Sequence, residues 1–169
     1  MKTEPKTIGK KAFAYSGLKK ITLSQKITTI GESAFAYCPI TSLVLTDNIS
    51  SIGSNAFEQS ALTTITMPKT LTEVPENCFN GCSALKTIGL NTGVKTIDKN
   101  ALKGCSSLLN ITIPANVETI GESAFEDCTK LYNVIFNAGI KYIKPRAFAN
   151  TTALTSVSFP YTLTELDGT

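Results

Sequence analysis

One short pattern recurs along almost the whole chain, and this repetition limits the possible folds more than any other feature. Its clearest marker is an Ala-Phe pair whose second residue returns first every 22 residues and then every 23. The members of this column are Phe13, Phe35, Phe57, Phe79, Leu102, Phe125 and Phe148. Because one unit is too short to bury its own apolar face, neighbouring units must stack on each other. The sequence therefore predicts a solenoid and not a globule with a single core.

Seven complete units fill residues 8–165 when each unit is counted from the apolar residue before the glycine column. They begin at Ile8, Ile30, Ile52, Val74, Ile97, Ile120 and Ile143. Residues 1–7 are a polar tail or the remnant of a preceding repeat, and residues 166–169 begin an eighth, truncated repeat. Neither end shows the capping repeat that solenoids need for solubility. We therefore expect a fragment of a longer protein whose export signal and remaining repeats have been removed.

Each unit contains three recurring segments. The first runs from the Ile-Gly pair to a cysteine column and is expected to be a single helical turn, α or 3₁₀, because Ser or Asn precedes the Ala column and suits a helix N-cap. These residues are Ser33, Asn55, Asn77, Asn100 and Ser123. The second segment has the form Leu-x-x-Ile-x-Leu and predicts a strand with one buried face. Its clearest copies are Leu18–Leu23, Leu62–Met67, Leu108–Ile113 and Leu131–Phe136.

Proline ends the second segment in three units, at Pro68, Pro114 and Pro160, where strand pairing should stop. The third segment is an apolar residue, two polar ones and the apolar residue that opens the next unit. We expect it to be a second, very short strand. The extra residue of the longer units falls just after the cysteine column, between Cys82 and Leu85, where a loop can absorb it without shifting the apolar columns.

The five cysteines are predicted to be buried thiols. Four of them, Cys38, Cys82, Cys105 and Cys128, share one repeat position, where Ser or Thr stands in the other units. A small side chain that fills the turn behind the Phe column explains this exchange. Disulfides between stacked units are the alternative, although side chains that point the same way have poor geometry for a bridge. A ladder would also spread four thiolates too far apart for one metal site.

Composition argues against several classes of function. The chain has no histidine and lacks nucleophile-elbow, P-loop and zinc-protease motifs, so we expect no enzyme, no cofactor and no metal. The net charge of +3 is small and its lysines are scattered, which makes nucleic-acid binding a weak interpretation. No stretch approaches the ~20 apolar residues of a membrane span.

The string IGESAFEDC at residues 120–128, followed by KLYNVIF, resembles the BspA-like leucine-rich repeats, which are also named after treponemal surface proteins. The pattern of Ala-Phe, Cys, Leu, Ile and Pro columns extends through all seven units. Local departures are Cys78 in the Ala column, Leu102 in the Phe column, and Ser16, Ser60 and Thr151 in the Cys column.

This resemblance implies a fold and a function. The expected fold class is α/β: a right-handed leucine-rich repeat solenoid with a parallel concave sheet, and with short helical turns and short second strands on the other side. The expected function is a non-catalytic protein-interaction module that attaches to host matrix or cells. The family also implies a bacterial, or sometimes protozoan, protein that is located at the cell surface or secreted.

The residues between the inward Leu and Ile columns should face the concave surface in rows of small polar side chains. Leu109, Tyr132 and Ile135 interrupt these rows in neighbouring units. An exposed apolar patch with a polar rim marks a protein contact, and Tyr is a favoured anchor. The candidate partner-binding residues are Leu109, Tyr132, Ile135, Asn110, Asn133 and Val44.

Three alternatives stay open at this stage. The polar rows are also what a merely solvated sheet face requires. The hydroxyl and Asn rows could bind a glycan, although the chain has no Trp to stack on sugars. The repeats could also be a structural spacer in a larger surface protein.

Overall fold

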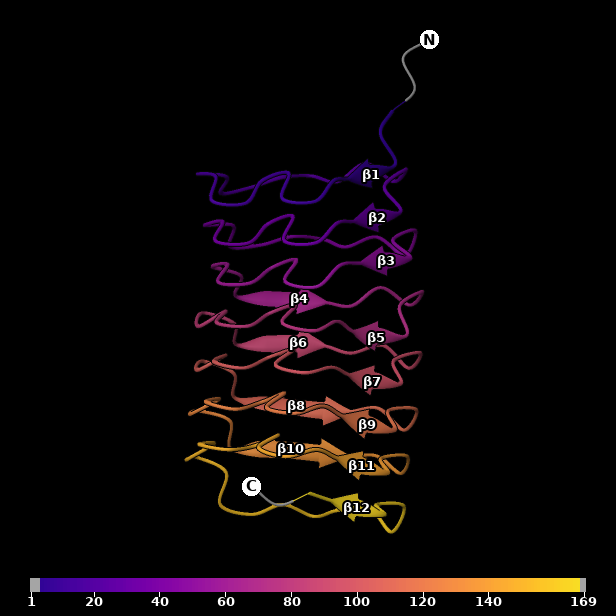
Figure 1. The fold of residues 1–169 in the computed structure, drawn as a ribbon, viewed down its shortest axis with the longest axis vertical. Coiled ribbons are helices and arrows are strands. Elements are labelled where there is room, and N and C mark those ends of the chain that lie inside the picture. Colours follow the sequence, from indigo (N-terminus) through magenta and orange to yellow (C-terminus); the bar gives the residue numbers. More distant parts are fainter. Residues whose placement is uncertain (1–3, 168–169) are drawn as a thin grey trace.

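The computed structural model describes residues 4–167, which form one stack of similar turns, here called rungs (Figure 1). The result is a parallel β-solenoid of about seven turns, as the repeat predicts. The first and last strands, at residues 7–8 and 165–166, lie at opposite ends of the stack. The predicted tail at residues 1–7 and the truncated repeat at 166–169 each lie partly outside the described residues.

The first column of strands contains the apolar residue that opens each unit. These very short strands are the second strands that the sequence predicts, and all of their pairings are parallel. They are β1 (Thr7–Ile8), β2 (Thr29–Ile30), β3 (Ser51–Ile52), β5 (Glu73–Val74), β7 (Thr96–Ile97), β9 (Thr119–Ile120), β11 (Tyr142–Ile143) and β12 (Glu165–Leu166).

A proline interrupts this column. The strands form a sheet β1-β2-β3 and a separate sheet β12-β11-β9-β7-β5. In the second and third rungs the residue after the strand extends the ladder, because the Gly31 N–H donates to Ile8 O and the Gly53 N–H donates to Ile30 O, both at 2.8 Å. Pro75 occupies this position in the fourth rung and has no N–H. The bond that would extend the ladder from β3 to β5 therefore cannot form.

The second column of strands comes from the Leu-x-x-Ile-x-Leu segments. Its members are β4 (Thr64–Thr66), β6 (Thr87–Gly89), β8 (Asn110–Ile113) and β10 (Asn133–Phe136). They pair in parallel as β4 with β6 and β8 with β10. Two of the predicted proline stops fit these bounds, since β8 ends directly before Pro114 and β4 ends two residues before Pro68.

The strand predicted at Leu18–Leu23 is wrong, because no strand forms there. In the second rung only Ser42 forms a bridge, to Thr64. A hollow of about 220 Å³ lies between the first two rungs and is lined by Lys20 and Thr22 on one side and by Ser42 and Val44 on the other. No hydrogen bond between backbone groups joins residues 18–23 to the second rung, so no ladder forms between the two rungs at this point.

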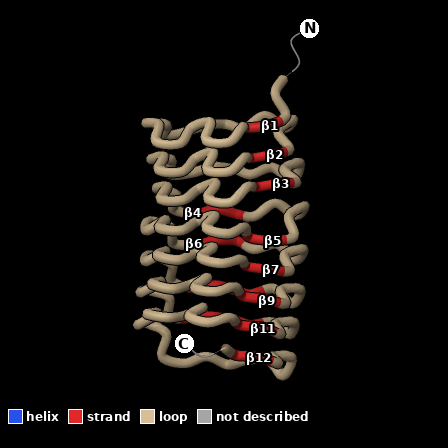
Figure 2. Tube along the Cα trace, in the orientation of Figure 1, coloured by secondary structure: helices blue, strands red, loops and turns tan. Residues whose placement is uncertain are grey.

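The predicted helical turn is also wrong. Residues 4–167 contain no helix, and Figure 2 shows only strands joined by loops and turns in this part of the chain. In the second rung the N–H groups of Ser33, Phe35 and Tyr37 donate to carbonyls of the third rung, while those of Ala34 and Ala36 close turns within their own rung. A helix would need all of these donors within one rung, and here every second donor bonds to the neighbour instead.

The residues predicted as N-caps have a different role. Each of them has a positive φ, between 53° and 59°, which is left-handed backbone and not the extended backbone of an N-cap. Asn tolerates the left-handed region better than most residues do, because its short polar side chain can bond to the backbone locally. The Ser/Asn column therefore marks a recurrent left-handed position on the side of the molecule formed by these turns, here called the turn face.

The extra residue of the 23-residue units is absorbed as predicted. In the fourth rung the Ser83 N–H donates to Gly81 O at 2.7 Å, and the Leu85 N–H donates to Cys82 O at 3.0 Å. These two bonds close a tight turn directly after the cysteine column. The ladder beyond it keeps its register, since Thr64 pairs with Thr87 and Ile65 with Ile88.

The core lies between the two strand columns and the turn face and follows the repeat along the stack. The Phe rings stack from rung to rung, with centroids 5.3 Å apart for Phe13 and Phe35, 5.6 Å for Phe35 and Phe57, and 5.4 Å for Phe57 and Phe79. Leu102 is also fully buried and continues the column where the aromatic ring is missing. Each rung thus covers the apolar side chains of the next, which none of them could do alone.

All five cysteine side chains are buried, as predicted, and their thiols are free. The four that share a column also donate hydrogen bonds to carbonyls of the preceding rung. Cys38 Sγ lies 3.0 Å from Leu18 O, Cys82 Sγ 2.9 Å from Phe57 O, Cys105 Sγ 3.3 Å from Phe79 O and Cys128 Sγ 3.2 Å from Leu102 O. A hydroxyl can donate in the same way, which gives the exchange with Ser a second physical reason.

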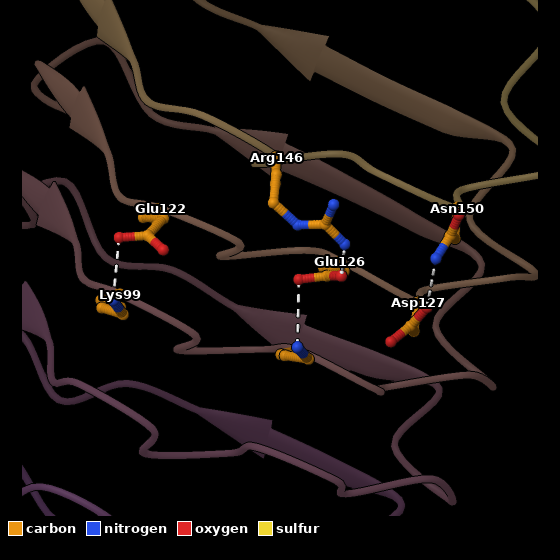
Figure 3. A network of polar contacts seen from close by, with 7 residues as sticks. Lys99, Glu122, Glu126, Asp127, Arg146 and Asn150 are labelled. Carbon is orange, nitrogen blue, oxygen red and sulfur yellow. Dashed lines mark hydrogen bonds and ion pairs between the residues drawn. The ribbon is translucent and has the colours of Figure 1, made fainter. Parts of the chain in front are cut away.

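Polar side chains link the rungs on the turn face (Figure 3). Glu126 is buried and lies between two cations, accepting from Lys103 Nζ at 3.1 Å on one side and from the Arg146 guanidinium on the other. The Arg146 hydrogen bond, with help from Ser123 and Lys103, lowers the pKa of Glu126 to about 2. Lys99 pairs with Glu122 at 2.8 Å in the same way, but both of these side chains are about half exposed.

Glycine is required where rungs approach each other closely. A Cβ added at Gly53 would lie 2.5 Å from the backbone N of Glu32, whereas a Cβ at Gly9, in the same column of the first rung, would meet nothing within 4 Å. We expect Gly53→Ala to destabilise the fold by about 1–3 kcal/mol through overpacking. Gly9→Ala should be neutral or slightly stabilising. Thermal unfolding followed by circular dichroism checks both, and equal midpoints for the two variants would contradict the close approach.

The buried carboxylate predicts a pH-dependent stability. The folded-state pKa of Glu126, about 2, lies below the value near 4.5 of an unfolded chain. Its stabilising effect is thus fully present above about pH 4.5 and is lost as the pH falls towards 2. Glu126→Gln should lower the unfolding midpoint at pH 7 by the equivalent of about 1–3 kcal/mol, and the difference from the parent chain should shrink between pH 4.5 and 2. Glu122→Gln, at a more exposed pair, is the control and should have a smaller effect.

The thiols should be unreactive in the native fold. Burial raises the pKa of Cys82 to about 11 and that of Cys128 to about 12, so the reactive thiolate is scarce at neutral pH. We expect Ellman's reagent to modify no thiol under native conditions and all five after denaturation without reductant. Fewer than five reactive thiols after denaturation would indicate a disulfide.

Candidate binding surface

The outward side chains of the second strand column form one surface, here called the strand face. Along β8 the exposed Asn110 and Thr112 alternate with the buried Ile111 and Ile113. Along β10 the exposed Asn133 and Ile135 flank the buried Val134. This alternation is what a strand with one buried side requires, so the strand face presents the polar rows that the sequence predicts.

Apolar side chains interrupt these rows on the fifth and sixth rungs. Leu109 is 39% exposed, Tyr132 56% and Ile135 48%. Leu109 and Tyr132 are direct neighbours, because the Tyr132 N–H donates to Leu109 O at 3.0 Å. Between Tyr132 and Ile135 along the strand lies Asn133, which pairs in register with Asn110. The structure therefore brings together five of the predicted residues as an asparagine pair flanked by apolar side chains, here called the apolar patch.

Val44 does not belong to this group. It is 80% exposed and lies in the same outward row as Ile135, but in the second rung and not in the sixth. At ~4.8 Å between strands, four rungs place it about 19 Å from Ile135. Hollows of about 220 and 250 Å³ lie on its two sides, towards the first rung and towards the third. Val44 is therefore a separate exposed apolar residue.

A hollow next to the apolar patch is a feature that sequence reasoning missed. It has a volume of about 380 Å³, and its lining includes Thr87, Gly89, Asn110, Thr112 and Asn137. Gly89 stands in an outward row otherwise made of Thr, Val, Ile and Ser, and a Cβ added there would lie 3.2 Å from Thr66 Oγ1. Gly89 is tightly packed towards the third rung and adds no side chain to the lining of the hollow, which lies towards the fifth rung. The lone glycine in that row was the available signal.

The strand face has little charge. Among the outward rows of residues 4–167, only Lys19, Lys20 and Lys86 are charged. The ion pairs within residues 4–167 lie outside these outward rows, as those of Lys99 with Glu122 and of Lys141 with Glu118 do. A partner at the apolar patch would therefore be recognised by shape, apolar contact and neutral hydrogen bonds.

Residues 4–167 show neither a metal-binding cluster nor a membrane-spanning helix. No group of three or more His, Cys, Asp or Glu side chains there is arranged to hold a metal ion. The same residues include no helix that is long and apolar enough to cross a membrane.

Comparison with known proteins identifies the repeat. A family model described as the BspA type leucine rich repeat region, with six copies, matches residues 6–132 and 50–169. No protein of curated function is similar enough to be matched.

Several solved structures have the same fold. A leucine-rich repeat protein from Bacteroides ovatus is 30% identical with a TM-score of 0.76, over 88% of this chain and 39% of the other. A leucine rich cell surface protein from Faecalibacterium prausnitzii is 35% identical with a TM-score of 0.68, over 72% of this chain and 33% of the other. A leucine-rich repeat protein from Eubacterium ventriosum is 27% identical with a TM-score of 0.74, over 90% of this chain and 43% of the other.

The chain thus spans less than half the length of these three relatives. The strand columns, the recurring Phe and Cys positions and the family match all agree with the resemblance that the sequence suggests. The chain belongs to the BspA-type leucine-rich repeat family.

Proposed function

We propose that the chain is a non-catalytic adhesion module that binds a protein ligand through its strand face, centred on the apolar patch. Leucine-rich repeat domains typically mediate protein interactions, and their fold is generally non-catalytic. The relative from Faecalibacterium prausnitzii is described as a cell surface protein. By this analogy the module acts at the cell surface or after secretion, and its ligand is a host matrix or cell-surface protein.

The observation on which this proposal rests is the apolar patch itself. Leu109, Tyr132 and Ile135 are each at least 39% exposed on a face made mostly of small polar side chains. The core does not require them, because the inward positions of the same strands are already filled by buried Ile and Val. Tyr supplies a large contact area with one polar end, and such residues contribute much of the binding free energy at protein interfaces.

The hollow at Gly89 supports the same location. Its lining includes Asn110, a member of the apolar patch, and Thr112, which pairs in register with Ile135, so a partner could place a side chain in the hollow while it covers Tyr132 and Ile135. Together the two features span three neighbouring rungs, or roughly 10 Å along the stack. This is enough for the anchor of an interface, whose polar rim the Thr and Asn rows would provide.

A paired substitution tests the proposal. We expect Tyr132→Ala with Ile135→Ser to weaken binding to the ligand at least tenfold, which corresponds to about 1.4 kcal/mol, and to leave the unfolding midpoint nearly unchanged because both side chains are exposed. The ligand would first be sought among purified fibronectin, fibrinogen, laminin and collagen. Affinity would then be measured by surface plasmon resonance.

Val44→Ser is the matched control, because Val44 is an exposed apolar residue of the same row outside the apolar patch. It should leave the affinity unchanged. Equal affinity of the parent chain and the double variant would exclude the apolar patch as the binding site. Absence of binding to every tested protein would favour the spacer interpretation.

A further inference from the structure

The turn face contains a second column of left-handed residues, four positions after the first. Its members are Tyr15, Tyr37, Gln59, Gly81, Gly104, Asp127 and Asn150, with φ between 54° and 71°. Gly adopts this backbone without a steric penalty, and Asn and Asp accept it better than most residues. The column therefore favours small or short polar residues, and Tyr15, Tyr37 and Gln59 of the first three rungs depart from this preference.

The two tyrosines are strained and yet exposed. Tyr15 has φ 58° and Tyr37 φ 57°, while their side chains are 73% and 44% exposed. Their rings stack with centroids 4.6 Å apart and an angle of 9° between the planes. One stacked pair contributes about as much free energy as a single bulky left-handed residue costs, so it does not offset two of them. Folding thus gives no reason for the pair, whereas strain at exposed side chains is a mark of functional sites.

A hollow lies beside this pair, on the side of Tyr37 away from Tyr15. Its volume is about 290 Å³, and its lining includes Tyr37, Pro39, Gln59, Gly81 and Ser83. The Gln59 side chain lies over Gly81, since a Cβ added to Gly81 would be 2.1 Å from Gln59 Nε2. It therefore does not continue the stack of the two rings, and Tyr37 lines the hollow on the side away from Tyr15.

The lining of this hollow has a definite chemistry. It combines an aromatic ring with the amide of Gln59 and the hydroxyl of Ser83, and it includes no charged side chain. The phenol of Tyr37 can donate a hydrogen bond, and the charge of nearby Glu58 raises its pKa. A flat apolar face bordered by a few neutral hydrogen-bonding groups suits a ligand with an apolar face and a hydroxyl rim. A neutral pyranose ring has this form.

We propose that the turn face of the second to fourth rungs is a binding site for a neutral pyranose sugar, which stacks on Tyr37 with its hydroxyls bonded to Gln59 and Ser83. Tyr15 stacks on the opposite side of the Tyr37 ring and supports it there. This site lies on a different face from the apolar patch and does not depend on the function proposed for the strand face.

The test is a titration of the chain with neutral tetrasaccharides of β-1,4-glucose, β-1,4-galactose, β-1,4-N-acetylglucosamine and α-1,6-mannose. Isothermal titration calorimetry measures affinity, and tyrosine fluorescence provides a second signal because the chain has no tryptophan. We expect at least one of these sugars to bind. Absence of binding by all four at millimolar concentration would overturn the proposal.

The test variants replace each tyrosine by Asn, a residue type that already occurs in the second left-handed column. Asn150 occupies the same left-handed position in the seventh rung, so Tyr37→Asn and Tyr15→Asn suit the local backbone. We expect Tyr37→Asn to weaken sugar binding at least tenfold and Tyr15→Asn about threefold, with an equal or higher unfolding midpoint in both. Undiminished binding by Tyr37→Asn would overturn the proposal, and a lower midpoint in both variants would show that the tyrosines are structural.

Two controls separate this site from others. Tyr161 is 93% exposed and belongs neither to the pair of Tyr15 and Tyr37 nor to the lining of the hollow beside it. Tyr161→Asn should therefore not change sugar binding. Tyr132→Ala with Ile135→Ser, on the strand face, should also bind sugar as the parent chain does. Loss of sugar binding in either control would place the sugar elsewhere and contradict the assignment to Tyr37.

Discussion

The fold depends on hydrogen bonds between the backbones of successive rungs. On the turn face every second N–H donates to the neighbouring rung, as those of Ser33, Phe35 and Tyr37 do. These bonds fix the separation of the rungs, and with it the stacking of the Phe rings and the reach of the cysteine thiols to the carbonyls of the preceding rung. Side-chain pairs such as Glu126 with Arg146 add to a spacing that the backbone has already set. A residue is therefore tolerated only if it leaves that spacing unchanged, and Gly53 is one example.

Much of this architecture could be predicted from the sequence, because the buried positions are apolar and recur at the period of the repeat. The apolar columns, the buried cysteines and both strand columns follow from the repeat of Leu, Ile and Phe positions. The turn segment was mispredicted because Ser and Asn suit two different backbone positions, the helix N-cap and the left-handed region. The identity of a residue such as Asn55 does not show whether it is an N-cap or has left-handed backbone. The answer depends on whether the N–H groups that follow it donate within the rung or to the neighbouring rung. That is a long-range property.

The candidate surfaces, too, could be predicted from the sequence only in part. Leu109, Tyr132 and Ile135 could be found in the sequence because the repeat predicts which positions face outward, and an apolar residue there departs from its column. The hollow at Gly89 could not be predicted from the sequence, because its existence depends on how closely neighbouring rungs approach each other. The tyrosines of the first two rungs were overlooked because nothing in the composition shows that their column has left-handed backbone. Repetition predicts the common frame, and local departures from it gain meaning only when their backbone conformation is known.

The tight turn after the cysteine column has a consequence for how such a chain can change over generations. The bonds of Ser83 and Leu85 take up one additional residue without altering the register of β4 and β6. Coding segments for 22-residue and 23-residue units are therefore physically interchangeable, and unequal recombination between them adds or removes a whole rung instead of shifting the frame of those that follow. Each such event lengthens or shortens the exposed faces by ~4.8 Å. It also moves an existing departure, such as Tyr132, to a new distance from the chain ends while preserving its immediate surroundings.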